Sequence, residues 1–242
     1  MKGSKVVLAK DGSKFLVRDT SKDLHTQFGF IKKSDLAKKG ERISTHKDKE
    51  FAIFPSFFID LYQKIKRDAQ IVPLKDIGAI ITEAGISKKS KVVDAGAGSG
   101  ALACFLGAVA KEVVTYDIRE DFIEVAKKNI QFLGLKNVKI KNQDIYNGIE
   151  EKNVDAVILD LPEPWKALDP AAKALKTGGF LVAYCPTIIQ ASDFVENGRK
   201  NDFAHVKTIE VIEREWEVEQ RKVRPKFMML GHSGFLSFLR RI

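Results

Sequence analysis

Short apolar runs rich in valine and isoleucine alternate with helical segments along most of this 242-residue chain. The runs are bounded by glycine or charged residues, as strands in a sheet usually are. Strands that alternate with helices pair in parallel and carry helices on both faces, so the pattern predicts a doubly wound α/β fold. Predicted strands lie at the start of 92–110 and at 112–117, 138–144, 154–160 and 180–185, and predicted helices at 76–84, at the end of 92–110, and at 120–133 and 168–176.

The C-terminal part of the chain departs from this alternation. Residues 205–219 alternate like a strand, residues 234–241 read as another strand, and no helix is expected between them. Two strands joined without a helix pair in antiparallel fashion. We therefore expect a Rossmann-like, mostly parallel sheet of seven strands whose last strand is antiparallel.

The N-terminal part has a different texture. Apolar runs at 5–10 and 14–19 flank an Asp-Gly-Ser turn, which predicts a β-hairpin, and further short apolar pieces follow. Residues 54–67 are more helix-like. We therefore predict a small β-rich N-terminal domain at 1–55, a linking helical segment at 56–73 and a catalytic domain at 74–242.

The positive charge of the chain is concentrated near its N-terminus. The net charge is +9 in total, and residues 1–75 hold 17 Lys and Arg against 9 Asp and Glu, which gives +8. A basic surplus at one end favours a polyanion-binding surface. The alternative is a lysine-rich solvated surface, of the kind found in heat-adapted proteins.

Several classes of protein are disfavoured by composition. No apolar run approaches the roughly 18 residues of a membrane span, and no signal peptide is apparent. Cys104 and Cys185 lie in apolar surroundings, so we expect buried free thiols. The four histidines show no metal-ligand spacing. We therefore expect a cytoplasmic protein with no membrane segment and no metal.

The sequence DAGAGSG at residues 94–100 follows the first strand of the alternating region and opens a helix. Glycines at such a turn let the backbone approach a ligand where a Cβ would clash. Gly96, Gly98 and Ala101 fit the dinucleotide pattern G-x-G-x-x-[GA]. Asp94 at the head of the turn would repel a pyrophosphate, however, and suits the ammonium and sulfonium groups of S-adenosylmethionine. A tight strand-to-helix turn without a ligand remains open.

Four successive predicted strands end with aspartate, at Asp94, Asp117, Asp144 and Asp160. Ligands of open α/β sheets bind at the carboxyl ends of the strands. A carboxylate after the second strand can accept both ribose hydroxyls of NAD or of S-adenosylmethionine. For any one aspartate, a helix N-cap is the simpler explanation. Together, the four predict an acidic rim that faces a ligand with positive charge and several donors.

These features resemble the class I S-adenosylmethionine-dependent methyltransferases. More narrowly, QIVxxKDIG from Gln70, DLPEPW from Asp160, YCPxxxQ from Tyr184 and GHSGFL from Gly231 resemble the tRNA adenine-N1 methyltransferases that act on the T-loop, conventionally at adenine 58. The resemblance spans about residues 70–242, and the small β module also fits. DLPEPW and GHSGFL are specific to this family, whereas the glycine turn is shared by many methyltransferases.

The resemblance implies both a cofactor and a set of site residues. The cofactor is S-adenosylmethionine, which leaves as S-adenosylhomocysteine. The implied contacts from the glycine turn and the strand ends are Val72, Gly96, Gly98, Ser99, Gly100, Ala101, Asp117, Asp144, Ile145 and Asp160.

Asp160 is also the implied catalytic residue, placed between cofactor and target base. A carboxylate that accepts from the N6 amine of adenine orients the base, raises electron density at N1 and stabilises the charge that develops on the ring. Pro162 and Pro164 stiffen the turn that carries it. Trp165 and Tyr184 are the expected contacts of the base, although Trp165 can equally be a core aromatic.

The implied substrate is tRNA, whose target base must leave its stack to reach the site. Binding to phosphates is expected from the basic N-terminal domain, in which Lys32, Lys33, Lys38 and Lys39 belong to the predicted basic patch. The resemblance also implies a homotetramer. Pro73 stands where relatives often have a tyrosine near the target base, which leaves open whether adenine 57 is methylated as well as adenine 58.

Three alternative functions remain. The first is another methyltransferase, for a protein isoaspartate or a small molecule, which would need neither DLPEPW nor a basic front domain. The second is a non-catalytic subunit that binds S-adenosylmethionine, which the intact glycine turn and Asp160 disfavour. The third is an NAD-dependent oxidoreductase, which Asp94 and the antiparallel end disfavour.

Overall fold

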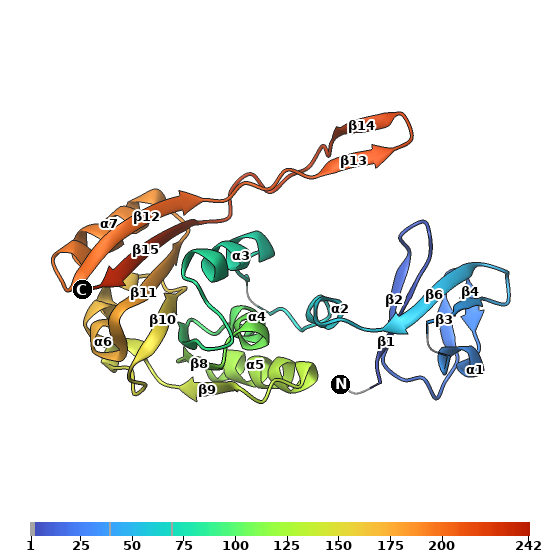
Figure 1. The fold of residues 1–242 in the computed structure, drawn as a ribbon, viewed down its shortest axis with the longest axis horizontal. Coiled ribbons are helices and arrows are strands. Elements are labelled where there is room, and N and C mark those ends of the chain that lie inside the picture. The colour runs from blue at the N-terminus through green and yellow to red at the C-terminus, as the bar shows by residue number, and fades with distance from the viewer. Residues whose placement is uncertain (1–2, 39, 69) are drawn as a thin grey trace. The chain divides into compact units, whose positions relative to one another are not determined.

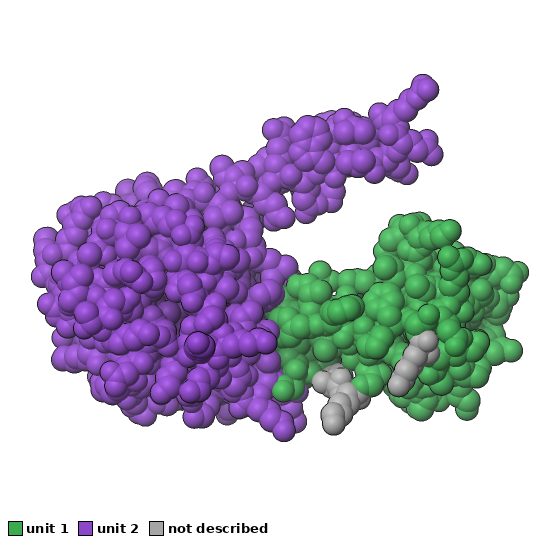
Figure 2. All heavy atoms as spheres, in the orientation of Figure 1, with its two compact units in different colours: residues 1–65, 132–134 green, residues 66–131, 135–242 purple. Residues whose placement is uncertain are grey.

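The computed structural model describes residues 3–38, 40–68 and 70–242, and the chain divides into two compact units. Unit 1 comprises residues 1–65 with 132–134, and unit 2 comprises residues 66–131 with 135–242 (Figure 2). Each unit encloses its own group of buried apolar side chains.

Unit 1 is a small antiparallel β module. The Asp-Gly-Ser turn closes a hairpin, as predicted, in which the Ala9 amide donates to the Ser13 carbonyl at 2.9 Å. Four strands pair in the order β2-β1-β6-β5, and β3 pairs with β4 beside them. The elements are β1 (Lys5–Leu8), β2 (Lys14–Val17), β3 (Leu24–Thr26), β4 (Gly29–Ile31), α1 (Lys33–Leu36), β5 (Arg42–Ser44), β6 (Glu50–Pro55) and α2 (Phe58–Tyr62).

Unit 2 is built on a seven-stranded sheet in the order β12-β15-β11-β10-β7-β8-β9 (Figure 1). The predicted fold is confirmed: β15, the last strand, is antiparallel to both of its neighbours, and the other strands run parallel to one another. The strands are β7 (Lys91–Ala95), β8 (Glu112–Asp117), β9 (Val138–Asn142), β10 (Val154–Leu159), β11 (Leu175–Cys185), β12 (Phe203–Glu210) and β15 (Phe235–Arg241).

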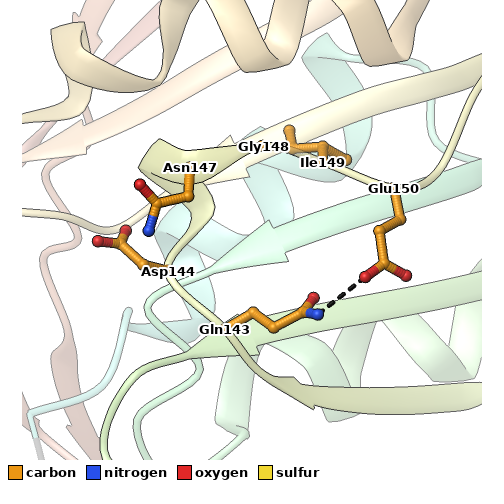
Figure 3. A pocket seen from close by; sticks show the side chains of 6 residues that line it. All are labelled: Gln143, Asp144, Asn147, Gly148, Ile149 and Glu150. Carbon is orange, nitrogen blue, oxygen red and sulfur yellow. Dashed lines mark hydrogen bonds between the residues drawn. The ribbon is translucent and has the colours of Figure 1, made fainter.

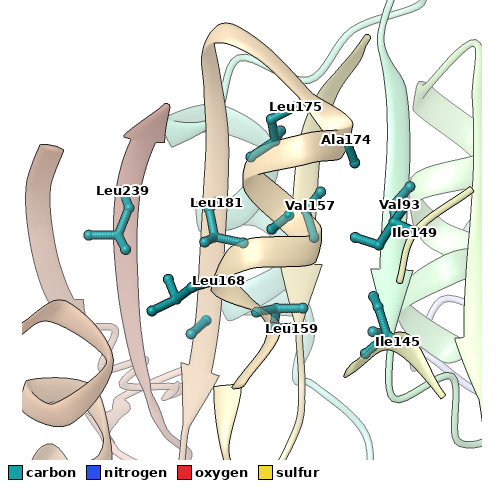
Figure 4. Close-up of a cluster of buried hydrophobic side chains, with 14 of the residues drawn as sticks. Val93, Ile145, Ile149, Val157, Leu159, Leu168, Ala174, Leu175, Leu181 and Leu239 are labelled. Atoms are coloured by element: carbon teal, nitrogen blue, oxygen red, sulfur yellow. The ribbon is translucent and has the colours of Figure 1, made fainter. Parts of the chain in front are cut away.

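Helices cover both faces of this sheet because its strands are apolar on both sides. Val93 and Ala95 of β7 belong to the core that α6 and α7 cover (Figure 4). Their neighbours Val92 and Asp94 point to the opposite face, since side chains alternate along a strand. The helices are α3 (Leu74–Glu83), α4 (Ala101–Val109), α5 (Glu120–Leu133), α6 (Leu168–Ala174) and α7 (Ile188–Arg199), with short 3₁₀ turns η1 (Ile145–Asn147) and η2 (Pro164–Ala167).

The structure corrects the sequence prediction at three places. The predicted strand at 205–219 exists but is shorter than predicted: β12 ends at Glu210, and a separate hairpin of β13 (Trp216–Glu219) and β14 (Lys222–Pro225) follows. The helix predicted at 168–176 ends at Ala174, and β11 starts directly after it, at Leu175. The pairing of β11 with β10 contains a register shift. Helix α7 was not predicted.

Residues 211–233, called the arm below, contain the β13–β14 hairpin and connect β12 to β15 (Figure 1). Its apolar side chains are unusually exposed, with Phe227 at 89% and Met228 at 90%. No helix in the described part of the chain is long and apolar enough to cross a membrane.

Candidate active site

The glycine turn after β7 lies against the end of β10. The amides of Gly96 and Ala97 both donate to the carbonyl of Tyr116 at 3.1 Å, which fixes the turn on β8. Gly96 has φ +84°, a conformation that side chains other than glycine rarely adopt. A Cβ on Gly96 would lie 2.1 Å from the carbonyl oxygen of Asp160. The close approach of the turn to Asp160 therefore requires glycine at this position.

The far side of the turn is held by α5. A Cβ on Gly100, whose φ is +75°, would lie 2.9 Å from the Ala126 side chain. The buried Asn129 amide donates to the Ser99 carbonyl at 2.8 Å and also bonds the backbone of Lys66. Asn129 was not predicted as a site-supporting residue. Its signal was a polar side chain on the buried face of an amphipathic helix.

Asp94 lies beneath the turn and is 1% exposed. One carboxyl oxygen accepts from the Thr115 hydroxyl at 2.6 Å, and the other has no hydrogen-bond partner in the described chain. Burial raises the pKa of Asp94 to about 7; the Thr115 bond works in the opposite direction, and the charges of Asp160 and Asp117 add to the rise. Asp94 is therefore a shielded acid close to two others.

Asp117 and Asp144 are both engaged with backbone amides. Asp117 accepts from Gly98 and from Arg119, each at 2.9 Å, and so ties the glycine turn to the end of β8. Asp144 caps η1 by accepting from the Tyr146 amide at 2.9 Å. The N-cap explanation thus holds for Asp144. A carboxylate has about four lone-pair positions, so both residues keep acceptor capacity for a ligand.

Asp160 follows β10 directly and begins the DLPEPW segment. Its amide donates to the Ala95 carbonyl at 2.9 Å, so its backbone is fixed on β7. Burial raises the pKa of the Asp160 carboxyl to about 6. The Gln190 side chain, on α7, donates to the Pro162 carbonyl at 3.1 Å. The turn that carries Asp160 is therefore held from both ends.

A pocket of about 200 Å³ lies at the carboxyl ends of four strands, β7, β8, β9 and β10. It brings together Gly96, Asp117, Asp144 and Ile145 from the predicted cofactor contacts. It also contains residues that were not predicted as cofactor contacts: Tyr116, Ile118, Gln143, Tyr146, Leu161, Pro162 and Glu163. Most of these directly follow or precede a strand-end aspartate, and that adjacency was the available signal.

A second, more open hollow of about 300 Å³ shares Gln143 and Asp144 with this pocket. The Gln143 side chain donates to Glu150 at 2.8 Å across it (Figure 3). None of its lining residues belongs to the glycine turn or to DLPEPW. We therefore take the smaller pocket, which touches both, as the candidate active site.

The remaining predicted contacts lie outside the pocket lining. Five of them are Val72, ahead of α3, and Gly98, Ser99, Gly100 and Ala101, in the turn and at the start of α4. The carboxyl side chain of Asp160 also is not part of the lining.

The residues predicted to contact the substrate lie in different parts of the chain. Trp165 lies in η2 and packs against the core of unit 2, which supports the core-aromatic alternative. Tyr184, near the end of β11, is 6% exposed. Lys32 and Lys33 are exposed on unit 1, and Lys38 pairs with Asp35 at 3.0 Å. Lys39 lies outside the described residues.

The chemistry available at the site is that of carboxylates. Within the described ranges, no group of three or more His, Cys, Asp or Glu side chains is arranged to hold a metal ion. Cys104 and Cys185 are buried free thiols, as predicted.

Comparison with known proteins identifies the family. The sequence model of the tRNA methyltransferase complex GCD14 subunit matches residues 61–233, which is most of the chain. The chain belongs to this tRNA methyltransferase family. The match covers the glycine turn, the strand-end aspartates and DLPEPW, which are the parts that form the pocket.

Two relatives extend the match towards the N-terminus. A Methanocaldococcus jannaschii protein named tRNA (adenine(57)-N(1)/adenine(58)-N(1))-methyltransferase TrmI is 35% identical, with 98% of this chain and 94% of the relative covered. A Thermus thermophilus protein named tRNA (adenine(58)-N(1))-methyltransferase TrmI is also 35% identical, with 84% and 81% covered.

Two solved structures share the fold over the whole chain. A Thermotoga maritima protein, described as a SAM-dependent O-methyltransferase, has a TM-score of 0.87 and 31% identity, with 100% of this chain and 94% of that one covered. The tRNA (m1A58) methyltransferase TrmI of Aquifex aeolicus has a TM-score of 0.81 and 26% identity, with 99% and 96% covered.

The collision at Gly96 predicts an unequal effect of two alanine substitutions. An alanine Cβ at Gly178, whose φ of +78° is similar, would meet no atom within 4 Å. Gly178→Ala should lower the free energy of unfolding by about 1–2 kcal/mol, the strain of a left-handed residue. Gly96→Ala should lower it further, because the added Cβ also displaces Asp160. Urea unfolding measures both losses, and equal losses would contradict the close approach.

Proposed function

We propose that this chain transfers a methyl group from S-adenosylmethionine to N1 of an adenine in the T-loop of tRNA, at position 58. The observation that carries the proposal is the contact between Gly96 and Asp160. It joins a turn typical of this cofactor to an acid in DLPEPW, the segment specific to this family. The names of the Methanocaldococcus and Thermus relatives support the substrate.

The site fits S-adenosylmethionine on two grounds. First, the glycines let the turn lie directly against Asp160 and Ala126, where a Cβ on Gly96 or Gly100 would collide, so the turn backbone is held at the strand ends. Second, Asp94 keeps a buried oxygen and Ser99 a buried hydroxyl, neither with a hydrogen-bond partner in the described chain. Asp117 would accept from the ribose hydroxyls and Asp144 from the adenine amine, with Ile145 beside the ring. When bound, the cofactor supplies an electrophilic methyl group on a sulfonium.

The remaining proposed contacts follow the same path. Gly98, Ser99, Gly100 and Ala101 would present backbone along the amino-acid part of the cofactor, and Val72 would cover it. The clustered carboxylates give this edge of the sheet a negative potential, which suits a ligand with sulfonium and ammonium groups. A pyrophosphate, as in NAD, would be repelled by the same charges.

Asp160 is the proposed catalytic residue. Its pKa of about 6 leaves the carboxylate ionised at neutral pH but within reach of a proton. It would accept from the N6 amine of the target adenine, which aligns N1 with the methyl group and raises its electron density. It can then take a proton from N6 after transfer. Tyr184 would form a wall of the base pocket; Trp165 is the weaker candidate because it packs in the core.

Binding of the tRNA would depend mainly on phosphate contacts. We assign these to exposed lysines of unit 1, of which Lys32, Lys33, Lys38 and Lys39 are the predicted members. Because the proposed substrate is tRNA, we place the enzyme in the cytoplasm. The exposed apolar side chains of the arm, including Phe227 and Met228, support self-association, and a homotetramer is the state that the family resemblance implies. Sedimentation equilibrium can test it.

Two further points concern specificity. The Methanocaldococcus name includes adenine 57 as well as adenine 58, so methylation at both positions is part of the proposal. The O-methyltransferase description of the Thermotoga structure favours a second candidate, a small-molecule or protein substrate that accepts the methyl group on oxygen. One experiment separates these possibilities.

The experiment is methyl transfer from labelled S-adenosylmethionine to an unmodified tRNA transcript, followed by nucleoside analysis. N1-methyladenosine should form, and it should disappear when adenine 58 is replaced by guanine. Partial loss with guanine at 58 and at 57 would show dual specificity. Asp160→Asn should lower turnover by about a hundredfold or more while cofactor affinity changes little, since general-base contributions are of this size. Absence of tRNA product from the wild-type chain would contradict the proposal.

The raised pKa of Asp160 predicts a pH dependence. Only the ionised carboxylate accepts from N6, so the single-turnover rate should rise with pH through about 6 and then level off. Asp160→Asn should lack this rise. Asp94→Asn separates the two acids, because the pKa of Asp94 is about 7; the rise near 6 should persist in it. A flat profile in the wild-type chain would exclude Asp160 as the titrating group.

Salt dependence tests the role of unit 1. Each lysine that contacts a phosphate should contribute about one unit to the slope of log K against log salt. Lys32→Ala and Lys33→Ala should therefore lower tRNA affinity and reduce the slope by about one each. Lys173→Ala, an exposed lysine of α6 paired with Asp169, is the matched control. Equal slopes of log K against log salt for all three variants would show that Lys32 and Lys33 do not contact phosphates.

A further inference from the structure

A buried ion pair lies at the start of α3. The side chains of Lys75 and Asp76 are 8% and 0% exposed. The Lys75 ammonium donates to both oxygens of Asp76 at 2.9 Å, to the Val211 carbonyl at 2.6 Å and to the Ser233 hydroxyl at 2.5 Å. The Ser233 hydroxyl in turn donates to Asp76 at 2.7 Å. These contacts define the Lys75 cluster.

The Lys75 cluster joins three segments that are distant in sequence. Lys75 and Asp76 belong to the QIVxxKDIG segment, and Ser233 belongs to GHSGFL. Val211 and Ser233 are the first and last residues of the arm. Both ends of the arm are therefore fastened to the first turn of α3.

A buried ion pair is weak evidence for a gain in stability. Replacing a buried ion pair with apolar residues of similar volume is often neutral or stabilising, because the charges lose their hydration. Here the partners of the ammonium use all three of its donors, so the geometry is fully specified. Such an arrangement fixes the position of backbone segments, which apolar packing does less sharply.

The segment that the Lys75 cluster fixes contacts Tyr184, the proposed wall of the base pocket. Gly234 follows Ser233, and a Cβ on Gly234 would lie 2.6 Å from two carbons of the Tyr184 ring. The Tyr184 hydroxyl is buried beside Ser233. Burial raises the pKa of Tyr184 to about 12; Ser233 works in the opposite direction, and the charges of Asp76 and Asp160 add to the rise. The charges of the Lys75 cluster and of Asp160 therefore both act on Tyr184.

We propose that Lys75, Asp76 and Ser233 are positioning residues for the methyl transfer. They hold Gly234 against the Tyr184 ring and so fix the wall against which the target adenine lies beside Asp160. The inference rests on the proposed function, since it assigns the cluster a role in placing that substrate. It also makes the base pocket depend on where the arm is fastened.

Ser233→Ala is the most selective test, because it keeps the Lys75–Asp76 pair. The kcat for tRNA methylation should fall by about tenfold, as expected for a small misplacement of a reacting base. The affinity for S-adenosylmethionine and the urea midpoint should change little. Ser233→Thr, which retains a hydroxyl, should restore most of kcat. Ser237→Ala is the matched control: it removes a buried hydroxyl bonded to Thr208 at 2.9 Å, on β15.

A double-mutant cycle identifies the residue through which Ser233 acts. If that residue is Tyr184, Ser233→Ala should lower kcat by less than about twofold when Tyr184 has already been replaced by leucine, because the effects of coupled residues are not additive. Additive losses would overturn the inference, as would equal behaviour of Ser233→Ala and Ser237→Ala.

A measurement without tRNA keeps this inference separate from the proposed function. The chain has four tyrosines, so ring-labelled tyrosine gives a simple NMR spectrum in which Tyr184→Phe assigns the Tyr184 signal. Ser233→Ala should shift that signal and Ser237→Ala should not. An unmoved signal would overturn the positioning role. If the wild-type chain methylates no tRNA but Ser233→Ala still shifts the Tyr184 signal, the proposed function is refuted. The contact between the Ser233–Gly234 segment and Tyr184 is then still supported.

Discussion

The site depends on one close approach, that of the Gly96 backbone to the backbone of Asp160. It exists because β7 and β10 are paired neighbours in the sheet, with Ala95 opposite Leu159. The Asp160 amide continues this pairing to the Ala95 carbonyl. Only a residue without a Cβ lets the turn after β7 run across the next strand end. The glycine turn and the proposed catalytic acid, Asp160, are therefore held by a single piece of backbone geometry.

The same edge of the sheet concentrates carboxylates that burial makes costly to ionise. The pKa values of Asp94 and Asp160 are raised to about 7 and about 6, which means that the protein loses stability when these groups ionise. For acids with raised pKa values, this loss develops as pH increases from about 4 towards 7. A cationic ligand would relieve it. Functional sites commonly show this conflict between local stability and chemistry.

The arm is held by polar contacts at its two ends rather than by apolar packing along its length. Its apolar side chains are exposed, yet both of its ends are tied to α3 by the Lys75 cluster. His232, one residue earlier, contacts Glu210 at 2.6 Å and the Pro186 carbonyl at 2.8 Å, and so adds a second tie to the ends of β12 and β11. Since Gly234, next to these contacts, lies against the Tyr184 ring, the same contacts hold the arm and the proposed wall of the base pocket.

The sequence by itself determined the sheet, because buried parallel strands are short, β-branched and apolar, and an aspartate lies within two residues of the carboxyl end of each site-facing strand. It also indicated the glycine turn and the family. It misread 205–219 because an exposed hairpin alternates like an edge strand, and α7 escaped because Ile188 and Ile189 are exposed at its start. Tertiary structure alone decided which residues meet: Asn129 with Ser99, Lys75 with Ser233, and Gly96 with Asp160. These contacts join segments that are distant along the chain, and local periodicity carries no record of such pairings.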